Sequence, residues 1–367
     1  MAATGHGPNV EWLEGLSPWP VDGFGLERIE ALLARLGNPE RTFAAIHVVG
    51  TNGKSTTART IARLLAAEAV RSASYLSPHV AGWHERLDTD PGGFERAVAR
   101  VRAAAEEAGA TQFETVTAAA FADFADRGVD VAVVEAGLGG RYDATNVISA
   151  PIVVLTNVAL DHTESLGGER QLIAAEKLAV VRPGATVILG EPEWGDLARA
   201  NGAVRVEHPG RSSLALAAAA AEAQLGRPLA ALPNRAEQLP GRLENRSDAP
   251  LEIWDGAHNL AAVGWLLARL PDRPFTIVAS IFADKDVEPM LRALAQRGDT
   301  LVATQSSSAR AMPAAQLAEL AGPRFKHVEA IAEPRTALRR GRELAGLGGA
   351  VLVTGSLHLL ADLSQDG

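Results

Sequence analysis

Apolar residues along the chain form short runs that alternate with segments of helical spacing. Four of these runs are rich in β-branched residues and apolar on both sides, which is typical of central parallel strands covered by helices. They span residues 44–50, 130–137, 150–158 and 185–190, and helical patterns lie at 55–69, 94–108, 114–126 and 168–181. This alternation predicts an α/β fold with a mostly parallel sheet.

A second series of the same kind follows residues 239–250, a polar stretch rich in Pro, Gly, Asn and Ser that indicates a linker. Its strand-like runs lie at 251–259, 275–286, 300–306, 327–331 and 350–356. A chain of 367 residues is long enough for two domains with their own cores. We therefore expect one domain over residues 1–240 and a smaller α/β domain over residues 241–367.

Composition narrows the class of protein. The chain has 35 Lys and Arg against 44 Asp and Glu, a net charge of −9, which argues against a nucleic-acid partner but leaves room for a local basic pocket. It has no cysteine, so disulfides, zinc–cysteine sites and thiol nucleophiles are excluded. The first residues show no signal-peptide pattern, and the Ala-rich run at 214–221 is too short to span a bilayer. We expect a cytoplasmic protein without a membrane partner.

The stretch "GTNGKST" at residues 50–56 is the first candidate for chemistry. It differs from the common phosphate-loop pattern, whose first glycine would fall at Val48. The stretch nevertheless lies between a predicted strand and a predicted helix, the context in which such a loop binds phosphate at the helix N-terminus. A chance glycine turn is the alternative. The sequence therefore favours a shorter phosphate loop, made of Gly50, Thr51, Asn52, Gly53, Lys54, Ser55 and Thr56.

The residue types in this loop suit a nucleotide. Gly50 and Gly53 allow the backbone to approach phosphate closely, and Lys54 can reach the terminal phosphates. Ser55 or Thr56 can serve Mg²⁺.

Polar residues also follow other predicted strands. Glu135 ends a buried strand and is followed by glycines, and Asp161 and His162 follow the next one. Because functional sites of parallel sheets gather at the carboxyl ends of strands, Glu135 is well placed to hold Mg²⁺ beside the phosphate loop. Alternatives stay open for each: a capping or salt-bridged Glu135 and a structural His162. Ser77 lies in a "SPH" turn that offers a hydroxyl to a cation but could be only a turn.

Lys177 lies in a helical pattern, where a lysine ordinarily extends its charged end to solvent, and the pattern alone gives it no role.

Taken together, these segments resemble the folylpolyglutamate synthase/dihydrofolate synthase family of the Mur-ligase superfamily. The matching stretches occur in the family's order and cover nearly the whole chain. They are "GTNGKST", "SPHVAGWHERL", "FETVTAAAFADFA", "EAGLGGRYDATN", "TNVALDHTESLG", "EKLAVVRPG", "LPGRLE", "DGAHN", "ADKD" and "TGSLHLLAD". The resemblance implies a P-loop central domain with a mostly parallel sheet, followed by a Rossmann-like glutamate-ligase domain.

The resemblance also implies the site. Ser77 and Glu135 would bind one Mg²⁺, Glu135 and His162 a second, and Lys177 would be carbamylated to support the second ion. ATP would be contacted by the phosphate loop and by Arg242, Asp255, His258 and Asn259. The pterin side would be formed by residues 21–28, with Gly23, Phe24, Gly25 and Leu26, and by Phe113, Glu114, Tyr142, Asp143 and Ala144.

Two departures from the family's pattern stand out. Ser55 replaces the glycine that usually follows the loop lysine, and Ser213 stands where an asparagine usually meets ATP. The loop after "HERL" is short, which bears on acceptor preference.

The implied reaction is the ATP-dependent addition of L-glutamate to dihydropteroate, to reduced folate, or to both, by a monomeric enzyme with Lys54, Glu135, His162 and Lys177 as catalytic residues. A cell-wall Mur ligase is an alternative, but only 49 residues precede Gly50, too few for its extra domain. A P-loop kinase would not explain "DGAHN", and a non-catalytic nucleotide-binding protein would not explain the retained metal ligands.

Overall fold

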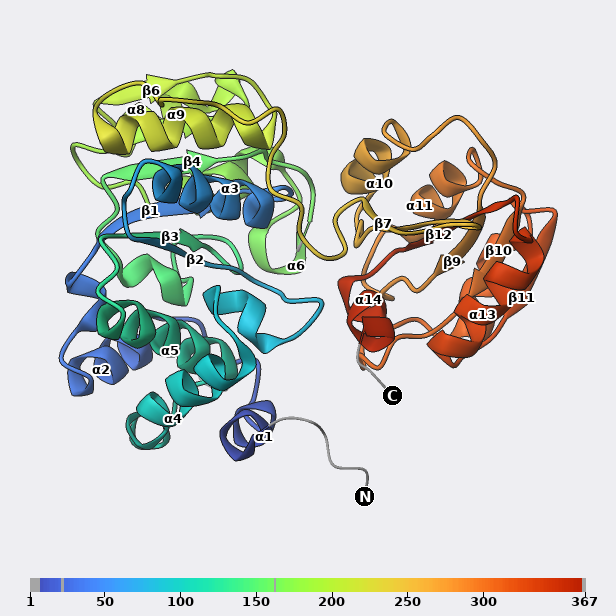
Figure 1. The fold of residues 1–367 in the computed structure, drawn as a ribbon, viewed down its shortest axis with the longest axis horizontal. Helices are drawn as coiled ribbons and strands as arrows, with labels where there is room; N and C mark the ends of the chain where they lie inside the picture. Colours follow the sequence, from blue (N-terminus) through green and yellow to red (C-terminus); the bar gives the residue numbers. More distant parts are fainter. Residues whose placement is uncertain (1–6, 21–22, 162, 365–367) are drawn as a thin grey trace. The chain divides into compact units, whose positions relative to one another are not determined.

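The structure, a computed structural model, describes residues 7–20, 23–161 and 163–364. The chain divides into two units, Met1–Pro78 with Trp83–Glu237, and His79–Gly82 with Gln238–Gly367. Each unit contains a six-stranded sheet, almost entirely parallel, with helices packed on both faces (Figure 1). The predicted α/β fold class is therefore confirmed.

The sheet of the first unit has the order β2-β3-β1-β4-β5-β6, and its described pairings are all parallel. Its strands are β1 (Ala44–Val49), β2 (Ser72–Tyr75), β3 (Val131–Glu135), β4 (Ile152–Leu155), β5 (Thr186–Leu189) and β6 (Arg205–Glu207). β1 lies at the centre, where Val48 is level with Glu135 of β3 and Val49 with Leu155 of β4. The loop after β1 therefore starts beside the carboxyl ends of both neighbours.

Helices cover both faces of this sheet (Figure 1). On one face, α3 packs against α9 and the strands beneath them. On the other face, α2, α4 and α5 enclose a core over β1, β2 and β3, and α7 and α8 enclose a second core over β4 and β5. The helices are α1 (Pro8–Glu14), α2 (Glu27–Arg35), α3 (Lys54–Ala67), α4 (Pro91–Ala108), α5 (Gln112–Asp126), α6 (Thr163–Leu166), α7 (Arg170–Leu178), α8 (Gly195–Ala200) and α9 (Ser213–Leu225), with short 3₁₀ turns η1 (Pro39–Arg41), η2 (Trp83–Leu87), η3 (Ala144–Val147) and η4 (Pro192–Trp194).

The sheet of the second unit has the order β11-β10-β9-β12-β8-β7. Its strands are β7 (Glu244–Asp248), β8 (Leu251–Trp254), β9 (Thr276–Ala279), β10 (Thr300–Ala303), β11 (His327–Ala330) and β12 (Ala350–Thr354). Only β7 runs antiparallel, as an edge strand beside β8. The prediction of a linker over 239–250 was therefore wrong for residues 244–248, because the polar sequence "ENRSD" forms β7 at an edge that faces solvent.

The apolar faces of the second sheet are covered by α10 (Leu260–Leu267), α11 (Val287–Leu294) and α12 (Ala314–Ala321) on one side. On the other side lie α13 (Pro334–Ala345) and α14 (Leu357–Ser364). Val80, from the short segment 79–82, packs in the core between the second sheet and helices α13 and α14.

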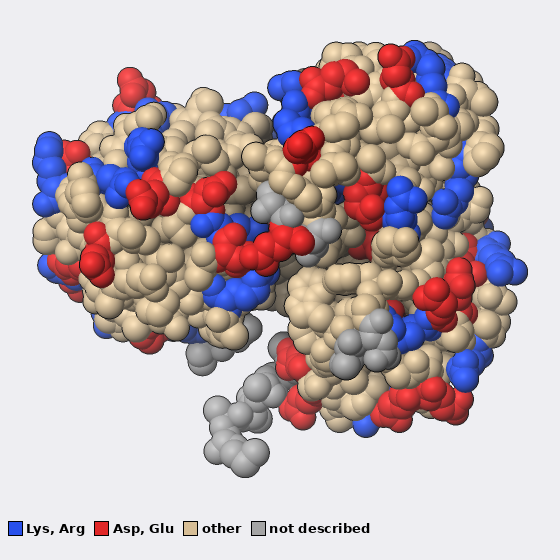
Figure 2. All heavy atoms as spheres, turned by 180° about the vertical axis from the view of Figure 1, so that it is seen from behind, with Lys and Arg blue, Asp and Glu red and all other residues tan. Residues whose placement is uncertain are grey.

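Acidic and basic side chains are interspersed over the surface drawn in Figure 2. Many form exposed ion pairs, such as Arg71–Asp130 at 2.6 Å, which typically contribute little to stability. Among the described residues, none of the helices combines the length and the apolar character needed to cross a membrane.

Candidate functional site at the carboxyl ends of the first sheet

The phosphate loop connects β1 to α3 in a conformation that requires its glycines. Gly50 has φ 145°, and a Cβ there would overlap the Thr156 hydroxyl. Gly53 has φ 79° and precedes α3 without a side-chain cap. The first amides of α3 are therefore available to an anion, which the positive end of the helix dipole also favours.

The loop is braced by Asn157, a residue that the sequence analysis did not single out. The Asn52 amide donates to Asn157 Oδ1 at 3.1 Å, and Asn157 Nδ2 donates to the Asn52 carbonyl at 2.9 Å. The Thr51 amide donates to the Asn157 carbonyl at 2.9 Å. An amide side chain two residues after the strand β4 was the available signal, but its partner depends on which strands are neighbours.

Glu135 is the centre of a buried polar cluster beside the loop. It is 1% exposed; its Oε1 accepts from the Ser55 hydroxyl at 3.1 Å, and its Oε2 accepts from the Ser77 amide at 3.1 Å. Lys54 Nζ lies 3.9 Å from Oε1 and donates to the Thr51 carbonyl at 3.3 Å. The structure thus brings together four residues predicted from three separate segments: Lys54, Ser55, Ser77 and Glu135.

Lys177 is buried, with 5% exposure, although it lies on a helix. Burial, and then the charge of Lys54, lower the pKa of Lys177 from 10.5 to about 7, while Asp161 acts in the opposite direction. Burial therefore favours the uncharged amine more strongly than it is favoured in an exposed lysine. This environment differs from the solvated lysine that the helical pattern alone suggests.

The glycine-rich loop after β3 packs against both Lys177 and Phe113, at Gly140 and Gly137. A Cβ on Gly140 would lie 2.7 Å from the Lys177 carbonyl, so α7 can approach only because a glycine stands there. A Cβ on Gly137 would lie 2.5 Å from Cζ of Phe113, so the outer end of this ring packs against the loop where the glycine stands. Phe113 also lies 6.2 Å, ring to ring, from the buried Tyr75.

Asp143, at the end of the glycine-rich loop after β3, is buried and hydrogen-bonds to backbone amides of the loop and of η3. Its oxygens accept the Leu138 amide at 2.7 Å and the Thr145 amide at 3.0 Å, and burial raises the pKa of Asp143. The Thr145 hydroxyl also donates to Asp143 and lies 2.8 Å from His47 Nε2. Burial, followed by the charge of Arg182, lowers the pKa of His47 to about 3, so this histidine is neutral. Ala144 is buried and Tyr142 is half exposed.

The segment 23–28 is attached to the start of α5. Arg28 Nε donates to Glu114 at 3.2 Å, and Arg28 Nη2 donates to the Gly23 carbonyl at 3.2 Å. Glu114 also closes a capping box with Thr111. Phe24 is half exposed and meets Trp19 edge-on, with ring centroids 6.0 Å apart. Residues 21 and 22 of the predicted segment lie outside the described residues.

The residues predicted to contact ATP lie in both units. In the first, the Ser213 hydroxyl lies 3.6 Å from the position of a Cβ on Gly53, so it reaches the phosphate loop. In the second, Asp255 accepts the Leu243 amide at 2.8 Å; burial raises the pKa of Asp255, and Arg242 opposes that shift. His258 Nδ1 lies 2.8 Å from the Gly256 carbonyl, and Asn259 caps α10.

The donor set suits Mg²⁺, since a buried carboxylate and hydroxyl groups are the hard oxygen ligands that this ion prefers. Among the described residues, no group of three His, Asp or Glu side chains is close enough to hold a metal ion. The predicted set relies instead on a serine and on His162, which lies outside the described residues. The assignments of individual ligands stay predictions.

Comparisons with known proteins match both parts of the chain. The Mur ligase middle domain matches residues 48–204, and the Mur ligase glutamate ligase domain matches residues 241–357. The dihydrofolate synthase/folylpolyglutamate synthase of Mycobacterium tuberculosis is 35% identical, over 84% of this chain and 80% of its own. That of Escherichia coli is 30% identical, over 97% and 94%.

Solved structures extend the likeness. Escherichia coli FolC, in complex with DHPP and ADP, superposes with a TM-score of 0.86 at 29% identity, covering 97% of each chain. A bifunctional folylpolyglutamate synthase/dihydrofolate synthase with Mn, AMPPNP and L-glutamate bound gives a TM-score of 0.81 at 29% identity, covering 98% of each chain.

Proposed function

Because this chain belongs to the dihydrofolate synthase/folylpolyglutamate synthase family of Mur ligases, we propose that it joins L-glutamate to a pterin-linked carboxylate by an ATP-dependent reaction. The observation that carries this proposal is the cluster of Lys54, Ser55, Ser77 and Glu135 around a glycine loop at the start of a helix. Such an arrangement suits a triphosphate with its cation. A simple P-loop kinase would not account for the glutamate ligase domain matched over residues 241–357.

The chemistry follows from the parts. A carboxylate is a poor electrophile, so transfer of the γ-phosphoryl group of ATP to it forms an acyl phosphate and ADP. The amine of glutamate then attacks the acyl carbon, and phosphate leaves as the amide forms. Lys54 and the amides of the loop would neutralise the charge on the transferred group, since phosphoryl transfer depends mainly on positioning and electrostatics.

Two Mg²⁺ ions fit this scheme. Ser77 and Glu135 would hold one ion and Glu135 and His162 the other, and the ions would supply positive charge beside the phosphates. A metal-bound imidazole cannot also accept a proton, so His162 would not be the general base.

We further propose that Lys177 is carbamylated. The uncharged amine nitrogen would form a bond to the carbon of CO₂ and lose a proton, which converts an ammonium group into a carboxylate. The burial that lowers the pKa of Lys177 to about 7 supports this step, because it makes the reactive neutral amine abundant at neutral pH. The carbamate would support the second ion through its water shell.

The acceptor would lie along Phe113 and the glycine loop, with Gly23–Leu26, Tyr142 and Ala144 near the pterin. Asp143 and Glu114 would act by shaping this surface, since each is engaged by neighbouring groups of the chain. Arg242, Asp255, His258 and Asn259 would contact the nucleotide. A monomeric state and a cytoplasmic location complete the proposal.

The test is glutamate-dependent release of phosphate from Mg-ATP, measured in parallel with dihydropteroate and with tetrahydrofolate. We expect turnover with both, as a bifunctional enzyme. Turnover with tetrahydrofolate alone would refute the dihydropteroate activity. Binding of ATP without turnover of either acceptor would overturn the ligase assignment.

A further inference from the structure

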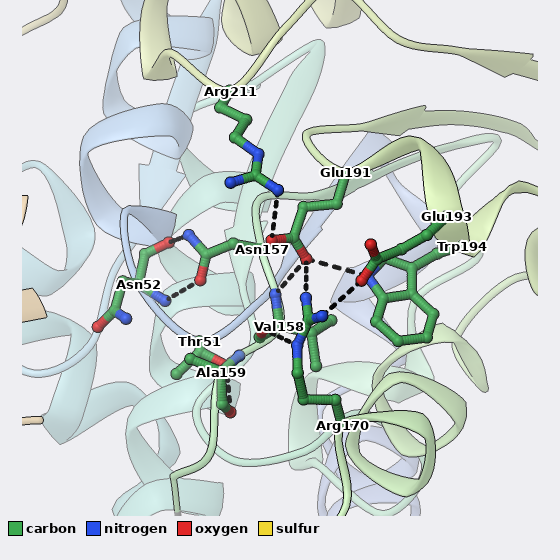
Figure 3. A network of polar contacts seen from close by, with 10 residues as sticks. All are labelled: Thr51, Asn52, Asn157, Val158, Ala159, Arg170, Glu191, Glu193, Trp194 and Arg211. Atoms are coloured by element: carbon green, nitrogen blue, oxygen red, sulfur yellow. Dashed lines mark hydrogen bonds and ion pairs between the residues drawn. The ribbon is translucent and has the colours of Figure 1, made fainter. Parts of the chain in front are cut away.

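A buried carboxylate, Glu191, lies just after β5 with 5% exposure and takes part in none of the chemistry proposed above. Its Oε2 accepts three donors, the Val158 amide at 3.0 Å, the Trp194 indole at 3.0 Å and Arg170 Nη2 at 2.9 Å (Figure 3). Its Oε1 pairs with Arg211 Nη2 at 3.3 Å. Glu191 is thus the centre of a network that joins the end of β5 to three other segments.

Glu191 and Arg170, which form an ion pair, both hydrogen-bond to the backbone of Val158 in the loop after β4. Glu191 accepts the amide of Val158, while Arg170 Nε donates to the carbonyl of the same residue at 2.9 Å. Arg170 is the first residue of α7, and its Nη1 is held in turn by Glu193 at 2.7 Å. The backbone at Val158 therefore has its position and its direction set by side chains from the loop after β5 and from α7.

The neighbours of Val158 contact the phosphate loop directly (Figure 3). Asn157 exchanges two hydrogen bonds with Asn52, at 3.1 and 2.9 Å. Ala159 donates its amide to the Thr51 hydroxyl at 3.0 Å. Residues 157–159 thus form a layer with the phosphate loop on one side and Glu191 on the other.

We propose that Glu191, through its ion pair with Arg170, is a positioning residue that sets the geometry of the phosphate loop and thereby the affinity for the nucleotide. This inference rests on the proposed function only in taking the nucleotide to be ATP. The ion pair joins a buried carboxylate to a half-exposed guanidinium, and such a pair is a weak source of stability because desolvation of the carboxylate offsets much of the attraction. The pair does fix the orientation of the backbone at Val158. The carboxylate binds the amide of this residue and the guanidinium binds its carbonyl, each with defined geometry.

The second unit offers a matched control. Glu252 is also buried, at 1% exposure, and also accepts an indole and an arginine: Trp254 Nε1 at 2.8 Å and Arg342 Nε at 2.6 Å. These partners are side chains of β8 and α13, far in sequence from the phosphate loop. Glu252→Gln should therefore report what loss of such a carboxylate does to stability alone.

The experiment compares Glu191→Gln with Glu252→Gln by calorimetric binding of ADP, by the KM for ATP and for glutamate, and by Tm. For Glu191→Gln we expect the Kd for ADP and the KM for ATP to rise about tenfold, as for couplings carried by such networks. The KM for glutamate should stay within about twofold. For Glu252→Gln we expect a lower Tm with unchanged nucleotide constants.

A second variant covers the case in which Glu191→Gln does not fold. Arg170→Gln removes the donor to Val158 from a half-exposed site, and it should raise the Kd for ADP in the same direction. Nucleotide constants unchanged in the folded variants, with only Tm lowered, would overturn the proposal. ADP binding is measured without turnover, so failure of the ligase assignment would be visible separately, as a wild-type protein that binds ADP but does not ligate.

Discussion

At the carboxyl ends of their strands, the first unit buries charged side chains, whereas the second buries mainly hydroxyl groups. The first sheet ends at Glu135, with Lys177 and Asp161 buried nearby. The second sheet ends at Asp255 and at five buried hydroxyls, those of Ser280, Thr304, Ser306, Thr354 and Ser356.

The two sets differ in what they cost to bury. Taking a charge out of water requires compensation by partners, whereas a hydroxyl can donate or accept and is much cheaper to bury. Two units with the same architecture thus differ where their strands end, and stability does not explain why one of them keeps charges. This contrast supports the proposal that phosphate and metal chemistry belongs to the first unit. The proposal can be tested by substitutions in either unit.

The largest effect is expected at Lys177. Lys177→Ala removes the group that would carry the carbamate, and we expect kcat for ligation to fall about 10³-fold with ADP binding largely retained. A short carboxylate such as formate should restore part of the activity. The control is Lys326→Ala, an exposed lysine paired with Asp299, which should leave kcat unchanged. Full activity of Lys177→Ala would remove the carbamate from the mechanism.

A smaller loss is expected at Glu135. Glu135→Gln keeps the size of the side chain and the acceptor for Ser55 but removes the charge, so kcat should fall about 10²-fold and the Mg²⁺ requirement should rise sharply. The measurement is a Mg²⁺ titration of activity. Glu40→Gln changes a buried carboxyl of η1, before the amino end of β1, and serves as the control. An unchanged titration for Glu135→Gln would place the cation elsewhere.

The sequence predicted this edge of the first sheet well because its signals are local. Glycines at 50 and 53 followed by a lysine, and a glutamate at the end of a β-branched run, can be recognised without knowing which strands are neighbours. The environment of Lys177 could not be predicted, because its burial depends on α7 packing against Gly140 across the fold. Asn157, His47 and Glu191 were missed for the same reason, since each acquires its partner from another strand or loop.

Two strands, β6 and β7, show where sequence patterns fail to predict secondary structure. β7 was missed because all five of its residues are polar, so no apolar alternation marks it as a strand. β6 has only three residues, too few for a period to be visible. Both lie at sheet edges and contain no buried residue, so burial imposes no apolar pattern on their sequences.

The smallest effect, and the one that tests the second unit, is expected at Thr354. Its hydroxyl is buried and has no hydrogen-bond partner within the described part of the chain, whereas the equally buried Thr304 donates to the Ala332 carbonyl at 3.1 Å. Thr354→Val should leave stability unchanged or raise it by about 1 kcal/mol, and Thr304→Val should lower it by a similar amount. Thermal unfolding of the two variants measures the difference.

The variants Thr354→Val and Thr304→Val also test whether the buried hydroxyls of the second unit take part in substrate binding. If the second edge contributes only packing, Thr354→Val should keep the KM for glutamate of the wild type, because no group that binds substrate has been removed. If the KM for glutamate of Thr354→Val rises severalfold while Tm is unchanged, the Thr354 hydroxyl binds a ligand rather than another group of the chain. The second unit would then, like the first, bury polar groups at its strand ends for chemistry, with neutral groups in place of charges.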